Sequence, residues 1–446
     1  MKLSVKPAFA RSLICLAILA GGSPAGAADL VASYRDAASN DPTFASARQS
    51  LLASQEKIPQ GRSLLLPQIV LSGNDTYSEQ LVEEAPYPTV FLRYPSRAFM
   101  VTLTQPLFRW ANFEQYQQDK LLVVQAEAQF AQAQQDLILR VSQAYFDVLN
   151  SRDTIDFLNA QKQAISEQLE SAKRNFDVGT ATITDTNEAE ARYDLAVSQA
   201  IAAESDLDVK EGALQQIIGH SPEGLAPLVP GVRMAQPEPA KMDMWVTSSQ
   251  VSNPAVAQSA ANLEVARRQI DIARAARYPT VDVVAQRQFQ RTLTSILPPD
   301  LGSDATNSVG IQVSIPLYTG GYNSSKITEA VALSDKADSD LEAARRSAAQ
   351  SARQAFVGVT SGIAQVRALE AAEVSSKTAL ESNKLGYQVG IRINIDVLNA
   401  QQQLYSTERD LAKARYDTLM NGLKLKAAAG TLQESDVIAI NVLLQH

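Results

Sequence analysis

The dominant pattern in this chain is a series of long stretches in which apolar residues recur mostly at three-, four- and seven-residue steps, without glycine or proline. The longest runs from Ala111 to Asn175, about 65 residues, and as one helix would extend about 95 Å. It is rich in Ala, Gln, Glu and Leu, which are good helix formers. Its apolar positions are Leu121, Val124, Phe130, Leu137, Val141, Tyr145 and Leu149.

Further stretches of the same kind predict more helices with one apolar stripe and one charged or glutamine-rich face. Such helices need partner helices on one side and water on the other. The pattern favours a hollow or sheet-like helical assembly over a thick core, and a set of ordinary coiled coils explains the periodicity equally well. The stretches are Thr180–Glu211, Ala255–Tyr278, Asn323–Val357, Ile363–Leu385 and Ile391–Asn421.

Polar and apolar residues alternate in two short segments of each half of the chain. They cover residues 69–78 and 99–104 in the first half, and 281–286 and 309–315 in the second. Alternation predicts one strand pair per half, apolar on one face and polar on the other. The connections, residues 79–97 and 291–307, contain several prolines and are predicted to be long exposed loops. A transmembrane β-barrel with a wet lumen has this pattern, as does a soluble antiparallel sheet.

The chain also repeats itself at an offset of about 211 residues, which is far too long a unit for a solenoid. We therefore predict two fused copies of one large unit, with domains over residues 28–220 and 253–430, a linker over 221–252 and a tail over 431–446. The matched landmarks are residues 40–42 with 252–254, Pro67 with Pro279, 105–108 with 315–318, 176–179 with 387–390, and Gly219 with Gly430.

The first 27 residues have the features of a secretory signal peptide. Lys2, Lys6 and Arg11 form a basic start, residues 13–20 are apolar, and residues 25–27 form a small-residue cleavage site. The mature chain is therefore expected to start at Ala28. The single cysteine, Cys15, lies inside the apolar run and is interpreted as part of the signal.

Composition argues against several classes of function. No cysteine remains after residue 27, and His220 and His446 are the two histidines, so disulfides, metal centres and a Ser-His-Asp triad are not expected. The formal charge of −8 becomes about −11 without the three signal cations, which argues against nucleic acid as a partner. We expect no cofactor and no enzymatic activity.

Membrane insertion by a helix is also not expected. No run of eighteen apolar residues follows the signal segment. If the protein spans a membrane, its spanning part must then be a closed β-barrel. Four strands cannot close a barrel of useful bore, so several chains would have to contribute strands.

Taken together, these features resemble the TolC family of outer-membrane efflux and secretion channels. The resemblance covers nearly all of the mature chain: the start at residues 34–47, both proline-flanked strand pairs, residues 144–149 and both Val-Gly turns. It implies a mixed α and β membrane protein in the outer membrane of a Gram-negative bacterium. Four strands from each subunit of a homotrimer would form a twelve-stranded β-barrel, continued by a periplasmic helical barrel. An equatorial belt would include residues 221–239 and the tail after Gly430.

Two Val-Gly turns carry the most informative polar residues. Gly179 is followed by Asp185, and Gly390 by Asp396, so that a glycine ends one helix and an acidic residue begins the next. Simple N-capping is one interpretation of both acids, and Asp185 with Glu188 is predicted to form a capping box.

The resemblance gives these turns a second interpretation, as a periplasmic gate. It implies bonds from Tyr387 and Arg392 to Thr184 and Asp185, which could be broken one at a time. Asp396 corresponds to the first of two acidic positions at the family's constriction, where three copies would form an anionic ring.

The second acidic position of that ring is Asn399 in this chain. The ring would therefore carry three charges fewer, and cation block would be weaker. The substitution leaves open whether Asn399 instead bonds across the axis and holds the gate shut.

A group of aromatic residues near the strands is predicted to form an interfacial girdle. Loop packing is an alternative for Tyr87, Phe91 and Tyr94. The group consists of Tyr77, Tyr87, Phe91, Tyr94, Phe99, Phe108 and Trp110.

The expected function is a passive exit duct that works with a periplasmic adaptor and an inner-membrane ABC or proton-driven pump, in contact with outer-membrane lipid. The cargo would be proteins, which we favour slightly, or small toxic compounds. The alternative is a periplasmic coiled-coil adaptor or scaffold without a pore. Such an adaptor should show a lipoyl-like β domain and usually a membrane anchor, and the sequence shows neither.

Overall fold

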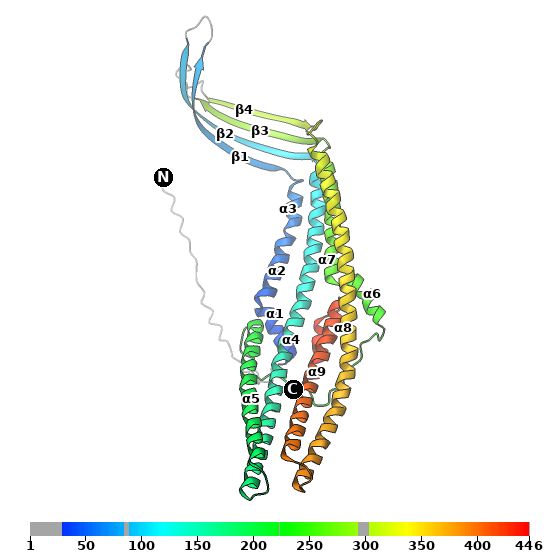
Figure 1. Ribbon diagram of the computed structural model, residues 1–446. Helices are drawn as coiled ribbons and strands as arrows, with labels where there is room; N and C mark the ends of the chain where they lie inside the picture. The colour runs from blue at the N-terminus through cyan, green and yellow to red at the C-terminus, as the bar shows by residue number, and fades with distance from the viewer. Residues whose placement is uncertain (1–28, 84–88, 223, 293–302, 446) are drawn as a thin grey trace, which may run out of the picture.

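The computed structural model describes residues 29–83, 89–222, 224–292 and 303–445 of the chain. The molecule is elongated, and a layer of long helices carries a four-stranded sheet at one end (Figure 1). The expected signal peptide over residues 1–27 and the aromatic position Tyr87 lie outside the described residues.

Two helices run the length of the helical layer. α4 (Trp110–Asp177) has 68 residues and α8 (Tyr322–Gln388) has 67, each about 100 Å long. At the end far from the sheet they turn back into α5 (Ile183–Ile218) and α9 (Asn394–Ala428), as Figure 1 shows. We call α4 with α5 the first hairpin and α8 with α9 the second hairpin. The predicted long amphipathic helices are confirmed.

Shorter helices fill the space beside these two. α2, α3 and α7 pack along the upper part of α4, α7 also packs on α8, α6 lies against α8, and α1 contacts α4, α5 and α10. These helices are α1 (Leu30–Asn40), α2 (Pro42–Gln55), α3 (Lys57–Ser63), α6 (Met242–Ser252), α7 (Pro254–Ala275) and α10 (Glu434–Asn441).

The predicted interruption between Val357 and Ile363 is wrong, because α8 continues through Gly358 and Gly362. A Cβ atom at Gly358 would lie 3.0 Å from the Cγ of Asn421, and one at Gly362 would lie 2.5 Å from the Oγ1 of Thr418. The two glycines therefore let α9 approach α8 closely. Their role is in helix packing, and close packing compensates for their low helix propensity.

The strands form one antiparallel sheet in the order β1-β2-β3-β4. They are β1 (Gln68–Val82), β2 (Val90–Phe108), β3 (Thr280–Thr292) and β4 (Ser303–Ser314). One strand pair per half is confirmed, but the long loops predicted over 79–97 and 291–307 are wrong, because the strands extend well into both segments. Pro95 pairs with Tyr77 of β1, beyond the point where β2 begins to pair with β3. Within the described residues, β2 has a neighbour on one side only at Pro95, and such a strand position tolerates proline.

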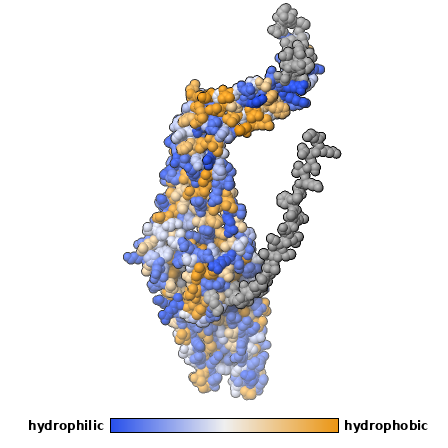
Figure 2. All heavy atoms as spheres, turned by 180° about the vertical axis from the view of Figure 1, so that it is seen from behind, coloured by the Kyte–Doolittle hydropathy of each residue, from blue (hydrophilic) through white to orange (hydrophobic). Residues whose placement is uncertain are grey.

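The sheet is apolar on one face and polar on the other, as the alternation predicted, because residues opposite each other on paired strands share a face. Figure 2 shows apolar side chains gathered over the sheet. The apolar face includes Ile69, Leu71, Val101, Leu103, Val281, Val283, Ala285, Val309, Ile311 and Val313, and the polar face includes Ser72, Asn74, Thr102, Thr104, Gln286, Gln288, Ser308 and Gln312.

The apolar band ends before the outer part of the strands. On the same face, Arg97 pairs with Asp75 at 2.9 Å, and Arg93 pairs with Glu79 at 2.9 Å. On β3 this face runs from Val281 to Phe289, about 26 Å at 3.3 Å per residue, which is close to the height of the lipid-facing band in membrane barrels. It carries one cation, Arg287, which lies opposite Val101 and over the ring of Phe289.

A half-buried ion pair joins the sheet to the helices. Arg109, the residue before α4, donates from Nε and Nη2 to the two carboxylate oxygens of Asp282 at 2.8 and 2.7 Å. The side chain of Asp282 is 7% exposed. A two-point contact of this kind fixes direction as well as distance, so it sets how the sheet leaves α4.

The largest hydrophobic core lies in the middle of the molecule, where α1, α4, α5 and α9 meet. Tyr145 is fully buried there and donates to the backbone oxygen of Ala226 at 2.9 Å. Leu228 forms a β-bridge with Leu444. The two segments assigned to the equatorial belt therefore lie side by side, against this core.

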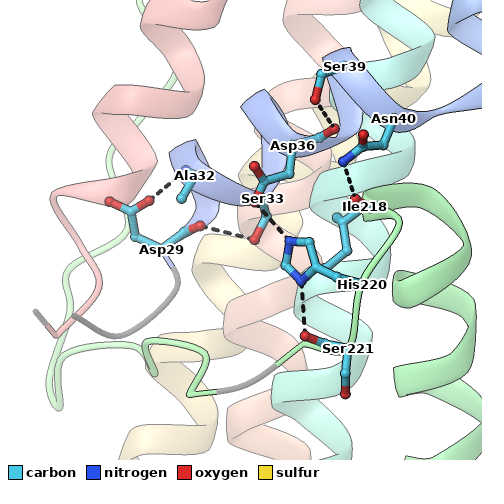
Figure 3. Close-up of polar contacts among 9 residues, drawn as sticks. All are labelled: Asp29, Ala32, Ser33, Asp36, Ser39, Asn40, Ile218, His220 and Ser221. Carbon is cyan, nitrogen blue, oxygen red and sulfur yellow. Dashed lines mark hydrogen bonds and ion pairs between the residues drawn. The ribbon is translucent and has the colours of Figure 1, made fainter. Parts of the chain in front are cut away.

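Polar contacts hold α1 in place at the same level (Figure 3). The side chain of Asp29 caps α1 by accepting from the backbone NH of Ala32, and Asn40 donates to the carbonyl of Ile218 at 2.8 Å. His220 lies 3.0 Å from the carboxylate of Asp36. The start of the described chain is thus fastened to the end of α5.

Among the helices in the described ranges, none combines the length and the apolar character needed to cross a bilayer.

Candidate functional site at the helix tips

The two hairpins end in turns with the same backbone geometry. In the first, the NH of Gly179 donates to the carbonyl of Phe176 at 2.9 Å, and the NH of Thr180 donates to the carbonyl of Asn175 at 2.8 Å. Gly179 has a φ of 77°, which favours glycine.

The second turn repeats this arrangement 211 positions later. The NH of Gly390 donates to the carbonyl of Tyr387 at 3.1 Å, and the NH of Ile391 donates to that of Gly386 at 2.9 Å. Gly390 has a φ of 80°. Gly179 and Gly390, at which the two helices were predicted to end, thus form the same left-handed turn in both halves.

The helix starts after the turns differ. In the first hairpin, Thr182 is the N-cap of α5: its Oγ1 accepts from the NH of Asp185, whose carboxylate accepts from the NH of Thr182 at 3.0 Å. The predicted capping box of Asp185 with Glu188 is wrong, because the helix begins three residues earlier than that pairing requires.

In the second hairpin, Ile393 occupies the N-cap position of α9, and its side chain makes no capping hydrogen bond. Asp396 is the third residue of the helix, so its predicted N-capping is wrong as well. Its carboxylate lies 3.6 Å from the guanidinium of Arg392, and both side chains are partly exposed. One acid is therefore bound in a capping box, while its counterpart keeps its charge accessible.

Tyr387 has a partner on the first hairpin within the single chain. Its hydroxyl accepts from the Nδ2 of Asn175 at 3.1 Å. Thr184 is exposed, and the carboxylate of Asp185 is bound to Thr182. The contacts of Tyr387 and Arg392 with Thr184 and Asp185 remain a prediction.

Further polar contacts join the two hairpins near the tip. Asn394 accepts from the Nε2 of Gln168 at 2.5 Å and donates to the backbone oxygen of Asp185 at 3.2 Å. Asn399 accepts from the Nη2 of Arg192 on α5 at 3.1 Å.

Sequence analysis did not single out Asn175, Gln168, Arg192 or Asn394. They meet partners that are 212, 226, 207 and 209 residues away in the chain. No local spacing could have identified them.

Asp396 opens onto a polar groove between α8 and α9. Ser375, Asn383, Arg392 and Asn399 also line this groove. The arrangement offers a carboxylate and several amide and hydroxyl oxygens, which can attract cations and accept hydrogen bonds.

A buried polar contact joins the hairpins further from the tip. Tyr416 of α9 donates to the carboxylate of Asp153 on α4 at 2.7 Å. Burial raises the pKa of Asp153, Asp156 raises it further, and the hydrogen bond from Tyr416 opposes this. Burial also raises the pKa of Tyr416, and the negative charge of Asp153 acts in the same direction.

Known proteins are similar to this chain in sequence and in fold. A family model described as outer membrane efflux protein matches residues 33–220 and 245–431. The outer membrane protein TolC of Vibrio cholerae serotype O1 is 32% identical over 416 residues, which covers 93% of each chain. The alkaline protease secretion protein AprF of Pseudomonas aeruginosa is 31% identical over 420 residues, covering 92% of this chain and 85% of its own.

Solved structures share the fold. The crystal structure of the outer membrane protein VceC of Vibrio cholerae has a TM-score of 0.77 at 18% identity, and the match covers 90% of this chain and 96% of VceC. The helical layer with its amphipathic sheet is therefore the fold of an outer-membrane channel.

The chain belongs to the outer membrane efflux protein family. It is an outer-membrane exit duct that extends into the periplasm, and its family consists of transport channels. The adaptor alternative finds no support among these relatives.

Proposed function

We propose that three copies of the chain form one continuous duct, with a twelve-stranded barrel in the outer membrane and a helical tunnel below it. The observation that carries this proposal is the sheet, which is apolar on one face. In the described part of the chain, β1 and β4 each pair on one side only. Unpaired strand edges are not tolerated in hydrocarbon, and pairing between copies would satisfy them. Four strands from each copy would close a barrel of twelve.

The tunnel would be gated where the hairpins end. Asp396 is the acid that we assign to a constriction ring, because no capping hydrogen bond holds its carboxylate. Tyr387 and Arg392 would hold the tip closed, through Asn175 in the same chain and through Thr184 and Asp185 as predicted. With Asn399 in the second ring position, the ring would carry one carboxylate per copy.

The duct would receive its cargo from an inner-membrane ABC or proton-driven pump through a periplasmic adaptor. A relative named for alkaline protease secretion supports protein cargo. Relatives named TolC and the efflux description of the family leave small toxic compounds as the second cargo class.

Single-channel conductance of the purified protein in planar bilayers tests this function. We expect a small, steady conductance that millimolar divalent or trivalent cations reduce from one side only. Asp396→Asn should remove this block, whereas Glu381→Gln, which neutralises an exposed acid on α8, should leave it unchanged. Folded oligomer without channel activity, or an equal block in both variants, would contradict the proposal.

A further inference from the structure

One arginine joins the two hairpins above the tip. Arg192 of α5 donates from Nη2 to the Oδ1 of Asn399 at 3.1 Å and from Nη1 to the Oε1 of Gln402. Asn399 and Gln402 are three residues apart and therefore neighbours on the surface of α9. The planar guanidinium can donate to two such acceptors at once, which a lysine cannot do in the same geometry.

Arg192 lies on the side of α5 that faces α9. Ala189 and Ala196, three residues before it and four after it, are 0% and 1% exposed. Both belong to the apolar cluster in which Leu398, the residue before Asn399, packs against α4 and α5. The arginine contact therefore lies at the margin of the cluster where α4, α5 and α9 meet.

Both acceptors of Arg192 are neutral amides, so its positive charge is not cancelled by them. Asp396 lies one helical turn before Asn399. A cation held at this position favours the association of the hairpins, and its partner Asn399 lies one helical turn from the carboxylate assigned to the constriction ring. Asn399 has its acceptor oxygen bound to α5 of the same chain, so its contribution depends on Arg192.

We propose that Arg192 is an additional positioning residue of the gate, which latches the first hairpin to α9 and holds the side chain of Asn399. This inference rests on the proposed function, since a latch requires a gate. It also answers the question that the sequence left open: the side chain of Asn399 fastens α9 to its neighbouring hairpin.

A double-mutant cycle between positions 192 and 399, measured as conductance in planar bilayers, tests the latch. Arg192→Gln should raise the leak of the closed channel about fivefold, the change expected for loss of a partly exposed contact. Lys384→Gln is the matched control, because it removes an exposed cation near the tip. It should leave the leak unchanged.

The informative comparison is Asn399→Asp made in the wild-type protein and in Arg192→Gln. With Arg192 present, the new carboxylate should bind the guanidinium, so that the leak falls and the cation concentration for half block stays within about twofold of wild type. With Arg192→Gln, the new carboxylates are unpaired, and half block should need about tenfold less cation. Arg192→Lys should keep the charge but give an intermediate leak, and Arg192→Met, which is also neutral, replaces Arg192→Gln if that variant does not fold.

An equal change in block in both backgrounds, or a leak in Arg192→Gln that matches Lys384→Gln, would overturn the latch alone. A wild-type protein that is folded but forms no channel would overturn the proposed function, which is a separate and distinguishable result.

Discussion

Helix α9 makes two contacts, one with its own hairpin partner and one with the first hairpin, and they are built differently. Toward α8 the buried contact is mainly apolar: Val397 and Leu404 pack with Leu380, and Leu411 continues the same seam. One ion pair accompanies it, from Arg415 of α9 to Glu370 of α8 at 3.0 Å. We call this contact with α8 the apolar seam. Toward the first hairpin, α9 contributes to the central core and to the apolar cluster around Leu398, and hydrogen bonds of Asn394, Asn399 and Tyr416 accompany both clusters. We call these hydrogen bonds the polar seam.

The two seams differ in whether water can replace their contacts when the helices separate. A buried leucine stabilises packing by roughly 1.5–3 kcal/mol, and water offers no substitute. A hydrogen bond contributes about 1 kcal/mol net, because both partners can bond to water after separation. We therefore expect the second hairpin to stay intact as a unit, and the polar seam to be the contact that separates when the tip opens.

The largest effect is expected in the apolar seam. Leu404 is 7% exposed, and Leu404→Ala should cost about 3 kcal/mol, because it removes packed atoms and leaves a cavity. Thermal unfolding followed by far-UV circular dichroism measures this loss. Leu385→Ala, on the same hairpin but at a side chain that is 62% exposed, is the control. Equal losses in both variants would show that the seam does not hold the hairpin together.

A smaller loss is expected when the polar seam is broken far from the tip. Tyr416 is 4% exposed, and Tyr416→Phe removes the hydroxyl that donates to Asp153. A partly buried acceptor without its partner should cost about 1–2 kcal/mol. Tyr405→Phe, at a half-buried tyrosine of the same helix, should have less effect on thermal unfolding. If Tyr416→Phe unfolds like wild type, the hydrogen bond does not contribute to the seam.

Sequence pattern was sufficient for the long helices, the amphipathic strands and the duplicated turns, because each depends on local periodicity or on one glycine. It was insufficient where packing decides. Gly358 and Gly362 suggested a helix end until the close approach of α9 was known. Pro95 suggested a loop because its place in the sheet, outside the β2–β3 pairing, cannot be read from the chain.

The candidate site shows the same limit. Asp185 and Asp396 were singled out by their distance from the turn glycines, but their different states depend on the residue one turn earlier. Thr182 can cap a helix and Ile393 cannot, so the same acid is bound in one turn and accessible in the other. The contacts of Arg192 join helices that are remote in sequence, and only the fold brings them together.

At the tip, breaking the polar contacts of Tyr387 and Arg392 should increase conductance. Arg392→Ser and Tyr387→Phe, made together, remove the partner of Asp396 and the hydroxyl that accepts from Asn175. We expect a leak several-fold above wild type, equivalent to about 1 kcal/mol, since the side chains are partly exposed. Planar-bilayer recording measures it, and Arg367→Ser at an exposed position of α8 is the control. Unchanged conductance in the double variant would show that these tip contacts do not hold the channel closed.

The smallest effect should reveal how the polar seam responds to pH. Burial raises the pKa of Asp153, so the folded protein binds this proton more tightly than the unfolded chain does. The resulting stabilisation is complete below the unfolded pKa of about 4 and is lost as pH rises through the folded value. Asparagine stays neutral and can still accept from Tyr416.

Asp153→Asn should therefore match wild type near pH 4 and exceed it by up to about 1 kcal/mol at pH 7. Thermal unfolding of both proteins between these pH values measures the difference, with Glu127→Gln, at an exposed acid of α4, as the control. A gap that does not widen with pH would mean that Asp153 is ionised equally in the folded and unfolded chain. A gap that widens with pH would mean that acid stabilises the contact between Tyr416 and Asp153 in the polar seam.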